Sequence, residues 1–208
     1  MKPTLHLQSF NPQPFQDRRK RLAKQMRELN PSGASIALIQ TAPEVVRNRD
    51  AHYDFRPDSY FYYLTGFTEP EAVLLLLVTA DSERSIVYCR EKNLEREIWD
   101  GYRLGPEKAP EYLQVNEARA IGTLAQDLPE WLSNAKAVFA PLASQSSLDE
   151  TLNTALNATR GLVRSGVSAP TQQFDIYALL DEMRLRKDAH EQQWLHAAGQ
   201  ISAAGHIR

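Results

Sequence analysis

The segment Ala72-Val73-Leu74-Leu75-Leu76-Leu77-Val78 is the longest apolar run in this chain of 208 residues, and a second strand-like run, Ser85-Ile86-Val87-Tyr88-Cys89-Arg90, follows it closely. The first run is far shorter than the ~20 residues that a membrane-spanning helix needs, so it predicts a buried β-strand. The link between the runs includes Ala80-Asp81-Ser82-Glu83, a short polar stretch that suits an antiparallel hairpin. We therefore expect strands over residues 72–79 and 85–90.

Helix and strand patterns alternate on both sides of this hairpin. The segment Glu44–Asp58 is polar and aperiodic, which predicts a surface loop. The sequence predicts helices over Phe15–Leu29, Ile121–Leu132 and Ser147–Thr159, and strands over Ser35–Gln40 and Ala137–Leu142. This alternation, with one hairpin-linked pair of strands, predicts an α/β fold in which helices cover both faces of a mixed sheet.

Composition and charge indicate a soluble globular protein with one main core. Hydrophobic residues make up 42% of the chain and charged residues 24%, and the formal net charge is -2. This balance gives no electrostatic basis for binding nucleic acid or an anionic membrane. The single basic cluster, Arg18-Arg19-Lys20-Arg21, is predicted to be the solvated face of an amphipathic helix, because apolar residues recur at helical spacing opposite it: Phe15, Leu22, Met26 and Leu29.

Two features predict a cytoplasmic location. Met1–Phe10 lacks the continuous apolar core of a secretory signal, and the lone Cys89 cannot form an internal disulfide. Cys89 alternates with Val87 in a strand-like run, so we expect a structural cysteine rather than a nucleophile.

Self-contained catalytic chemistry is not predicted for this chain. The glycine pattern Gly161–Ser168 places Val167 where a phosphate loop needs lysine, and no histidine pair has the spacing that zinc peptidases use. The carboxylates are scattered along the chain, which predicts solvated roles rather than an acid/base pair: Glu69, Glu71, Glu95, Glu97 and Asp100. We therefore predict neither catalytic residues nor metal ligands here.

Three sequence segments carry a family resemblance. Ala42-Pro43-Glu44-Val45 precedes Tyr60-Phe61-Tyr62-Tyr63-Leu64-Thr65-Gly66-Phe67-Thr68-Glu69-Pro70-Glu71-Ala72-Val73, and Glu97-Ile98-Trp99-Asp100-Gly101-Tyr102-Arg103-Leu104-Gly105 follows. In this order they resemble the amino-terminal domain of aminopeptidase P, in the creatinase and prolidase superfamily. The resemblance extends through essentially the whole chain and implies a mixed sheet of about six strands. It also implies a parent enzyme that removes the residue before proline, using a dinuclear Mn(II) site in a carboxy-terminal pita-bread domain. None of those metal ligands is in this chain.

The resemblance also implies a domain division. Residues 1–176 correspond to the amino-terminal domain, and residues 177–208 to the start of the catalytic domain, with Ser168-Ala169-Pro170-Thr171 as a boundary-like stretch. Met183–Asp188 resembles the Met-Arg-Leu-Ile-Lys-Ser segment of the family, although Arg186, Asp188, Ala189 and His190 depart from the usual residues. The predicted helix Ala189–Ile207 carries an apolar stripe of Trp194, Leu195, Ala198, Ile201 and Gly205.

Three residues match family positions at the rim of the substrate cleft: Trp99, Asp50 and Arg164. Ordinary structural roles compete with this interpretation, since a tryptophan is usually packed and a loop aspartate usually makes a turn. The aromatic residues Tyr60, Phe61, Tyr62 and Phe67 are predicted to serve core and hairpin packing rather than a ligand platform.

Two functional hypotheses follow. The first is the non-catalytic domain of a longer Xaa-Pro aminopeptidase, which makes homo-oligomer contacts, shapes a cleft for peptides with proline second, and is itself inactive. The second is a stand-alone module that binds peptides or proteins. The stretch Gly205-His206-Ile207-Arg208 ends in mid-pattern without a helix stop signal, which favours the first hypothesis.

Overall fold

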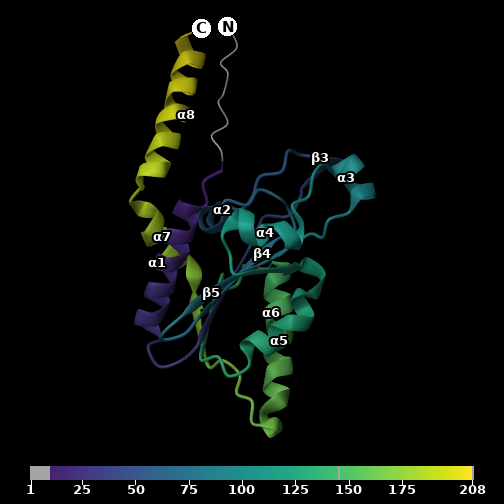
Figure 1. The fold of residues 1–208 in the computed structure, drawn as a ribbon, viewed down its shortest axis with the longest axis vertical. Helices are drawn as coiled ribbons and strands as arrows, with labels where there is room; N and C mark the ends of the chain where they lie inside the picture. Colours follow the sequence, from purple (N-terminus) through teal and green to yellow (C-terminus); the bar gives the residue numbers. More distant parts are fainter. Residues whose placement is uncertain (1–9, 145, 208) are drawn as a thin grey trace.

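The computed structural model describes residues 10–144 and 146–207, and its centre is a mixed six-stranded sheet (Figure 1). The strand order is β6-β5-β4-β1-β7-β8. The bounds are Ser35–Gln40 (β1), Val73–Val78 (β4), Glu83–Cys89 (β5), Glu117–Ala120 (β6), Ala137–Ala140 (β7) and Gln172–Asp175 (β8). β4 pairs antiparallel with β1 and β5, and the other three pairings are parallel. The predicted sheet and its central hairpin are confirmed.

Alternate residues of the central strands enter two separate cores. In β1, Ile36 and Leu38 face one core, while Ala37 and Ile39 face the other. Such strands are apolar on both sides because helices cover both faces. α5 (Leu124–Leu132) and α6 (Ser147–Gly161) pack on one face, whereas α1 (Gln13–Leu29), α2 (Ser59–Thr65), α4 (Gly105–Leu113) and α7 (Ile176–Leu185) pack on the other (Figure 1).

The prediction for the basic cluster of α1 was wrong for two of its residues. Arg18 and Arg19 are buried, with 5% and 2% of their surface exposed. Arg19 donates hydrogen bonds to the carbonyl oxygens of Leu64, Leu113 and Gln114, at 2.8, 3.2 and 2.6 Å. The ends of α2 and α4 leave these carbonyl groups without helical partners, so a buried guanidinium satisfies them. Sequence periodicity along α1 contains no information about this.

Most of the aromatic run at residues 60–67 forms α2. The Asp58 side chain accepts hydrogen bonds from the backbone N–H groups of Tyr60 and Phe61, both at 2.9 Å, and caps the helix. Gly66 ends it with a left-handed φ of 66°. Phe61 and Phe67 are buried in one core cluster with Leu76 of β4 and Val87 of β5, so the predicted packing in the core and against the hairpin is confirmed for these two residues.

Several elements were not predicted. The segment 44–58 contains a small hairpin of β2 (Val46–Asn48) and β3 (Ala51–His52), and the chain after β5 forms α3 (Leu94–Asp100), then α4 and β6. The predicted helix from Ile121 begins as the 3₁₀ turn η1 (Ile121–Thr123), and η2 (Leu162–Ser165) follows α6. The boundary-like stretch 168–171 precedes β8, which pairs with β7, so the sheet continues beyond it.

The last helix, α8 (Ala189–Ile207), has no buried residue and extends away from the sheet (Figure 1). Its start is held by Asp188, whose Oδ2 accepts hydrogen bonds from Arg18 Nε at 3.0 Å and Nη2 at 2.7 Å. Trp194, Leu195 and Ile201 are exposed along it. Among the helices described, none is both long and apolar enough to cross a membrane. The prediction that a secretory signal is absent concerns residues 1–10, of which only Phe10 is described.

Candidate functional site

Residues 91–104, between β5 and α4, form a projecting segment that we call the Trp99 arm. It contains α3, none of whose residues is buried. The side chain of Asn93 accepts a hydrogen bond from Arg96 N at 3.0 Å and caps the helix, and Gly101, with φ of 83°, ends it. Trp99 is 85% exposed, so it does not pack into the core of this chain. The sequence alternative of an ordinary packed tryptophan is therefore wrong.

Asp50 lies in the turn between β2 and β3 and is exposed. The preceding residue, Arg49, has a left-handed φ of 50°, which is typical of a tight turn. β3 and α3 project on the same side of the molecule, at the right of Figure 1. The structure thus places Asp50 and Trp99 on two exposed segments on one side.

Arg164 lies elsewhere. It belongs to η2, which directly follows α6, and it is exposed. In Figure 1 this part of the chain lies at the lower end of α6, far from α3 and β3. Within one copy of the chain, the structure does not bring Arg164 together with Trp99 and Asp50.

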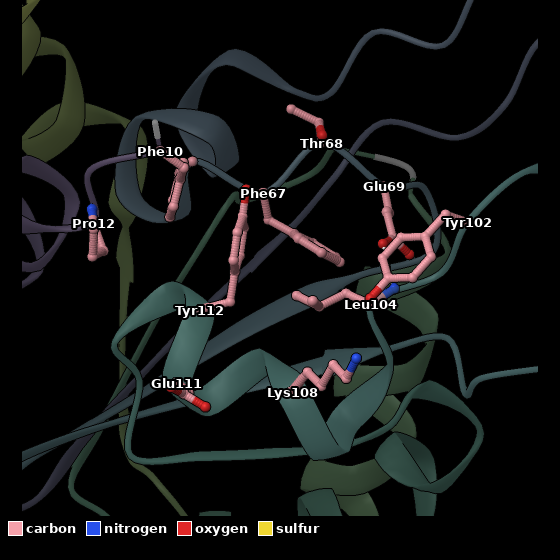
Figure 2. A pocket seen from close by; sticks show the side chains of 11 residues that line it. Phe10, Pro12, Phe67, Thr68, Glu69, Tyr102, Leu104, Lys108, Glu111 and Tyr112 are labelled. Atoms are coloured by element: carbon pink, nitrogen blue, oxygen red, sulfur yellow. Dashed lines mark hydrogen bonds between the residues drawn. The ribbon is translucent and has the colours of Figure 1, made fainter. Parts of the chain in front are cut away.

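A pocket of about 830 Å³ opens beside the base of the Trp99 arm (Figure 2). Its volume falls in the usual range of small-molecule sites. At one end the rings of Phe10 and Tyr112 stack with centroids 4.5 Å apart, and at the other Glu69 and Tyr102 lie close together. The sequence analysis did not predict this pocket, whose lining comes from distant segments: Phe10, Pro12, Gly66, Phe67, Thr68, Glu69, Tyr102, Leu104, Lys108, Glu111 and Tyr112.

Glu69 is a structural anchor rather than the solvated carboxylate that we predicted. Its side chain is 15% exposed, and its Oε2 lies 3.7 Å from Nη2 of Arg90, itself 8% exposed. Its Oε1 accepts a hydrogen bond from Leu104 N at 2.7 Å. Glu97 is also mostly covered, with its side chain 13% exposed and paired with Lys92. For Glu69 and Glu97 the predicted solvated role was therefore wrong.

The described part of the chain brings together no group of three or more His, Cys, Asp or Glu side chains that could hold a metal ion. The described residues therefore do not provide the converging oxygen and nitrogen donors that a pair of Mn(II) ions needs. Cys89 is buried, and burial, with smaller contributions from Glu69 and Glu107, raises the pKa of its thiol to about 12. The thiol is protonated at neutral pH, as expected for a structural cysteine.

Comparisons with known proteins agree along the whole chain. Residues 15–139 match the model of the aminopeptidase P N-terminal domain. The Xaa-Pro aminopeptidase of Escherichia coli is 39% identical over 197 residues, which is 94% of this chain and 44% of that protein. The Xaa-Pro aminopeptidase of Haemophilus influenzae is 39% identical over 93% of this chain and 41% of that protein. The chain thus spans less than half the length of these relatives.

Solved structures show the same fold. A zinc-substituted E. coli aminopeptidase P in complex with product has a TM-score of 0.90 at 38% identity, over 96% of this chain and 44% of that chain. The same enzyme with the inhibitor Pro-Leu has a TM-score of 0.89 at 37% identity, with the same coverage. The chain therefore belongs to the family of the aminopeptidase P N-terminal domain.

Proposed function

We propose that this chain is the non-catalytic amino-terminal part of a longer Xaa-Pro aminopeptidase, in which it shapes the substrate cleft and contributes to oligomer contacts. One observation carries the proposal: the similarity covers 94% of this chain but 44% of the E. coli Xaa-Pro aminopeptidase. Residues 177–208 then form the start of the second, pita-bread domain. We place the protein in the cytoplasm.

The proposed chemistry lies outside this chain. A prolyl peptide bond has no N–H, so a general aminopeptidase that needs this donor cannot recognise it. The metal-dependent hydrolysis that the resemblance implies would be supplied by two Mn(II) ions bound to residues of the longer protein outside this chain. The described residues provide no ligand cluster for these ions, so their contribution is to binding and orientation.

The projecting segments support a role at the rim of a cleft. Trp99 and Asp50 lie on two exposed segments on one side of the molecule, where they can contact a peptide held by a neighbouring domain or chain. Arg164 belongs to η2 after α6, a part of the chain that lies far from α3 and β3 in Figure 1. A single cleft bordered by all three residues therefore requires Arg164 from a second copy, which is consistent with the proposed homo-oligomer.

The exposed surface of α8 supports a following domain. None of the 19 residues of this helix is buried, and two large apolar side chains, Trp194 and Ile201, are 51% and 61% exposed. Amphipathic or apolar helices gain most of their stability from packing. A domain that packs against α8 would cover these side chains.

Reading the coding DNA beyond Arg208 tests the proposal. An open frame of at least the length of this chain, encoding two aspartates, one histidine and two glutamates as a metal site, is the expected result. An immediate stop codon would refute it and favour the second candidate.

That second candidate is a stand-alone peptide-binding module, and the 830 Å³ pocket beside the Trp99 arm is the observation in its favour. Calorimetric titration of the 208-residue chain with short Xaa-Pro peptides separates the two. Micromolar binding that is lost in Tyr112→Ala would support the module. The proposed function expects no such binding by the chain alone.

A further inference from the structure

The Trp99 arm has an unusual distribution of polarity. Its apolar side chains point outward, with Leu94, Ile98 and Trp99 exposed by 72%, 77% and 85%. α3 has seven residues and buries none of them. A helix of this length has little stability of its own, and no residue of α3 is buried in a core. The polar contacts at its base are therefore the candidates for what fixes its position.

Lys92 lies at the centre of these contacts. Its Nζ donates to both carboxylate oxygens of Glu97, at 3.0 and 3.2 Å, and to the carbonyl oxygen of Arg103 at 3.3 Å. The ammonium group also lies 4.3 Å from the centroid of the Tyr102 ring. One cation thus joins the segment before α3, α3 itself, and the segment after it.

The backbone of Gly105 lies beside Lys92 at the base of the arm. It has φ of 74°, and a Cβ atom there would lie 3.4 Å from Lys92 Cβ, which is an ordinary van der Waals distance. The neighbouring Leu104 donates a backbone hydrogen bond to the side chain of Glu69. The same carboxylate forms an ion pair with Arg90. Figure 2 shows Glu69, Tyr102 and Leu104 clustered at this end of the pocket. The base is thus held at Leu104 by Glu69, whereas Glu97 of α3 is held by Lys92.

We propose that Lys92 is a positioning residue, which fixes the Trp99 arm by joining Glu97, the Arg103 carbonyl and the Tyr102 ring. The consequence for substrate handling rests on the proposed rim function of Trp99. The mechanical consequence does not: without the cation, α3 keeps the ion pair of Asp100 with Arg103 at 3.1 Å but loses the contact of Glu97 with Lys92, so Trp99 becomes more mobile. Ordering of a rim residue before substrate arrives lowers the entropic cost of binding.

The experiment uses the 208-residue chain with a nitroxide spin label on Arg96→Cys, an exposed position of α3. The native Cys89 is buried and resists labelling, which the unsubstituted chain verifies. Lys92→Met keeps the apolar stem and removes the charge, Lys92→Arg keeps the charge, and Lys24→Met removes an exposed charge from α1 as the matched control. Amide exchange of residues 94–104 and the thermal midpoint are measured alongside the spectrum, on chains without the label.

We expect Lys92→Met to increase label mobility and to accelerate amide exchange of residues 94–104 by about fivefold, with the thermal midpoint unchanged, since the arm is outside both cores. Lys92→Arg should restore most of the protection. Glu97→Gln should reproduce the effect, and Lys92→Met combined with Glu97→Gln should add little, because the two substitutions remove the same contact.

Unchanged label mobility and exchange in Lys92→Met, or equal loosening in Lys24→Met, would overturn the proposal. Failure of Lys92→Arg to restore protection would overturn the role of the charge. The rim function fails separately: if Trp99→Ala leaves KM of the longer enzyme unchanged while Lys92→Met loosens the arm, the positioning stands and the function proposed for Trp99 does not.

Discussion

Arg19→Met tests how the helical layer on one face of the sheet is held together. Methionine retains an apolar stem and removes three hydrogen bonds to the carbonyl oxygens of Leu64, Leu113 and Gln114. Each buried acceptor left without a donor costs about 1–3 kcal/mol. Burial lowers the pKa of the Arg19 guanidinium to about 10, so its removal also relieves a desolvation cost. Taking the lower value for each carbonyl, we expect a loss of about 3 kcal/mol in the free energy of unfolding.

Urea denaturation, monitored by circular dichroism, measures this loss in the free energy of unfolding directly. For a chain of this size the loss corresponds to a decrease of about 6–12 °C in the thermal midpoint. Lys20→Met is the matched control, since Lys20 is the next residue of α1 and is exposed; it should change stability by less than about 0.5 kcal/mol. A loss below about 1 kcal/mol in Arg19→Met would show that water satisfies the three carbonyl groups, and would refute the reasoning.

Three other predictions concern the site, the last helix and pH. Trp99→Ala should leave the stability of the chain within about 0.5 kcal/mol of the wild type, because the side chain is 85% exposed. In the longer enzyme this substitution should raise KM more than it lowers kcat. A lower thermal midpoint with unchanged kinetics would contradict this prediction. Amides of α8 should exchange faster than those of α1, because α8 has no buried residue. Deletion of residues 189–208 should remove any self-association seen by light scattering. A protected α8 in a strictly monomeric chain would contradict both expectations. Burial raises the pKa of Asp127, but hydrogen bonds from Arg119, Tyr88 and Thr123 outweigh it and hold this pKa below its ordinary value. The stabilisation is therefore fully present above the pKa of the unfolded state, near 3.9, and is lost as the pH falls through the pKa of the folded state. The difference in stability between the wild type and Asp127→Asn should shrink below about pH 4. A constant difference would refute the assignment.

The central part of the fold was predictable because its patterns are strong. The apolar run 73–78 and the alternation after it have the periods of strands, and α1 and α6 have helical periods. The two outermost strands were not predictable. β6 reads Glu-Ala-Arg-Ala and β8 reads Gln-Gln-Phe-Asp, which are short, polar sequences whose pairing partners lie far away in the chain. Such edge strands form because a neighbouring strand offers backbone N–H and C=O groups with which they can form hydrogen bonds.

The candidate site was predictable only where a motif carried it. Trp99 was found through the resemblance, and its exposure agrees with a surface role. The pocket and the anchor at Glu69 were not found, because Glu69 contacts Leu104 and Arg90, which are 35 and 21 positions away in sequence. The burial of Arg18 and Arg19 was missed for the same reason. A charged residue on a helix is normally solvated, and only tertiary contacts reveal an exception.

We propose that this chain contributes shape and contacts to an Xaa-Pro aminopeptidase whose chemistry lies in a following domain. The most direct measurement compares hydrolysis of an Xaa-Pro peptide, in the presence of Mn(II), by the 208-residue chain and by the full-length protein of which it is a part. We expect turnover by the longer protein, none by the chain alone, and no micromolar Mn(II) binding by the chain in calorimetry. Turnover by the 208-residue chain, or a longer protein that cleaves no Xaa-Pro peptide, would contradict it.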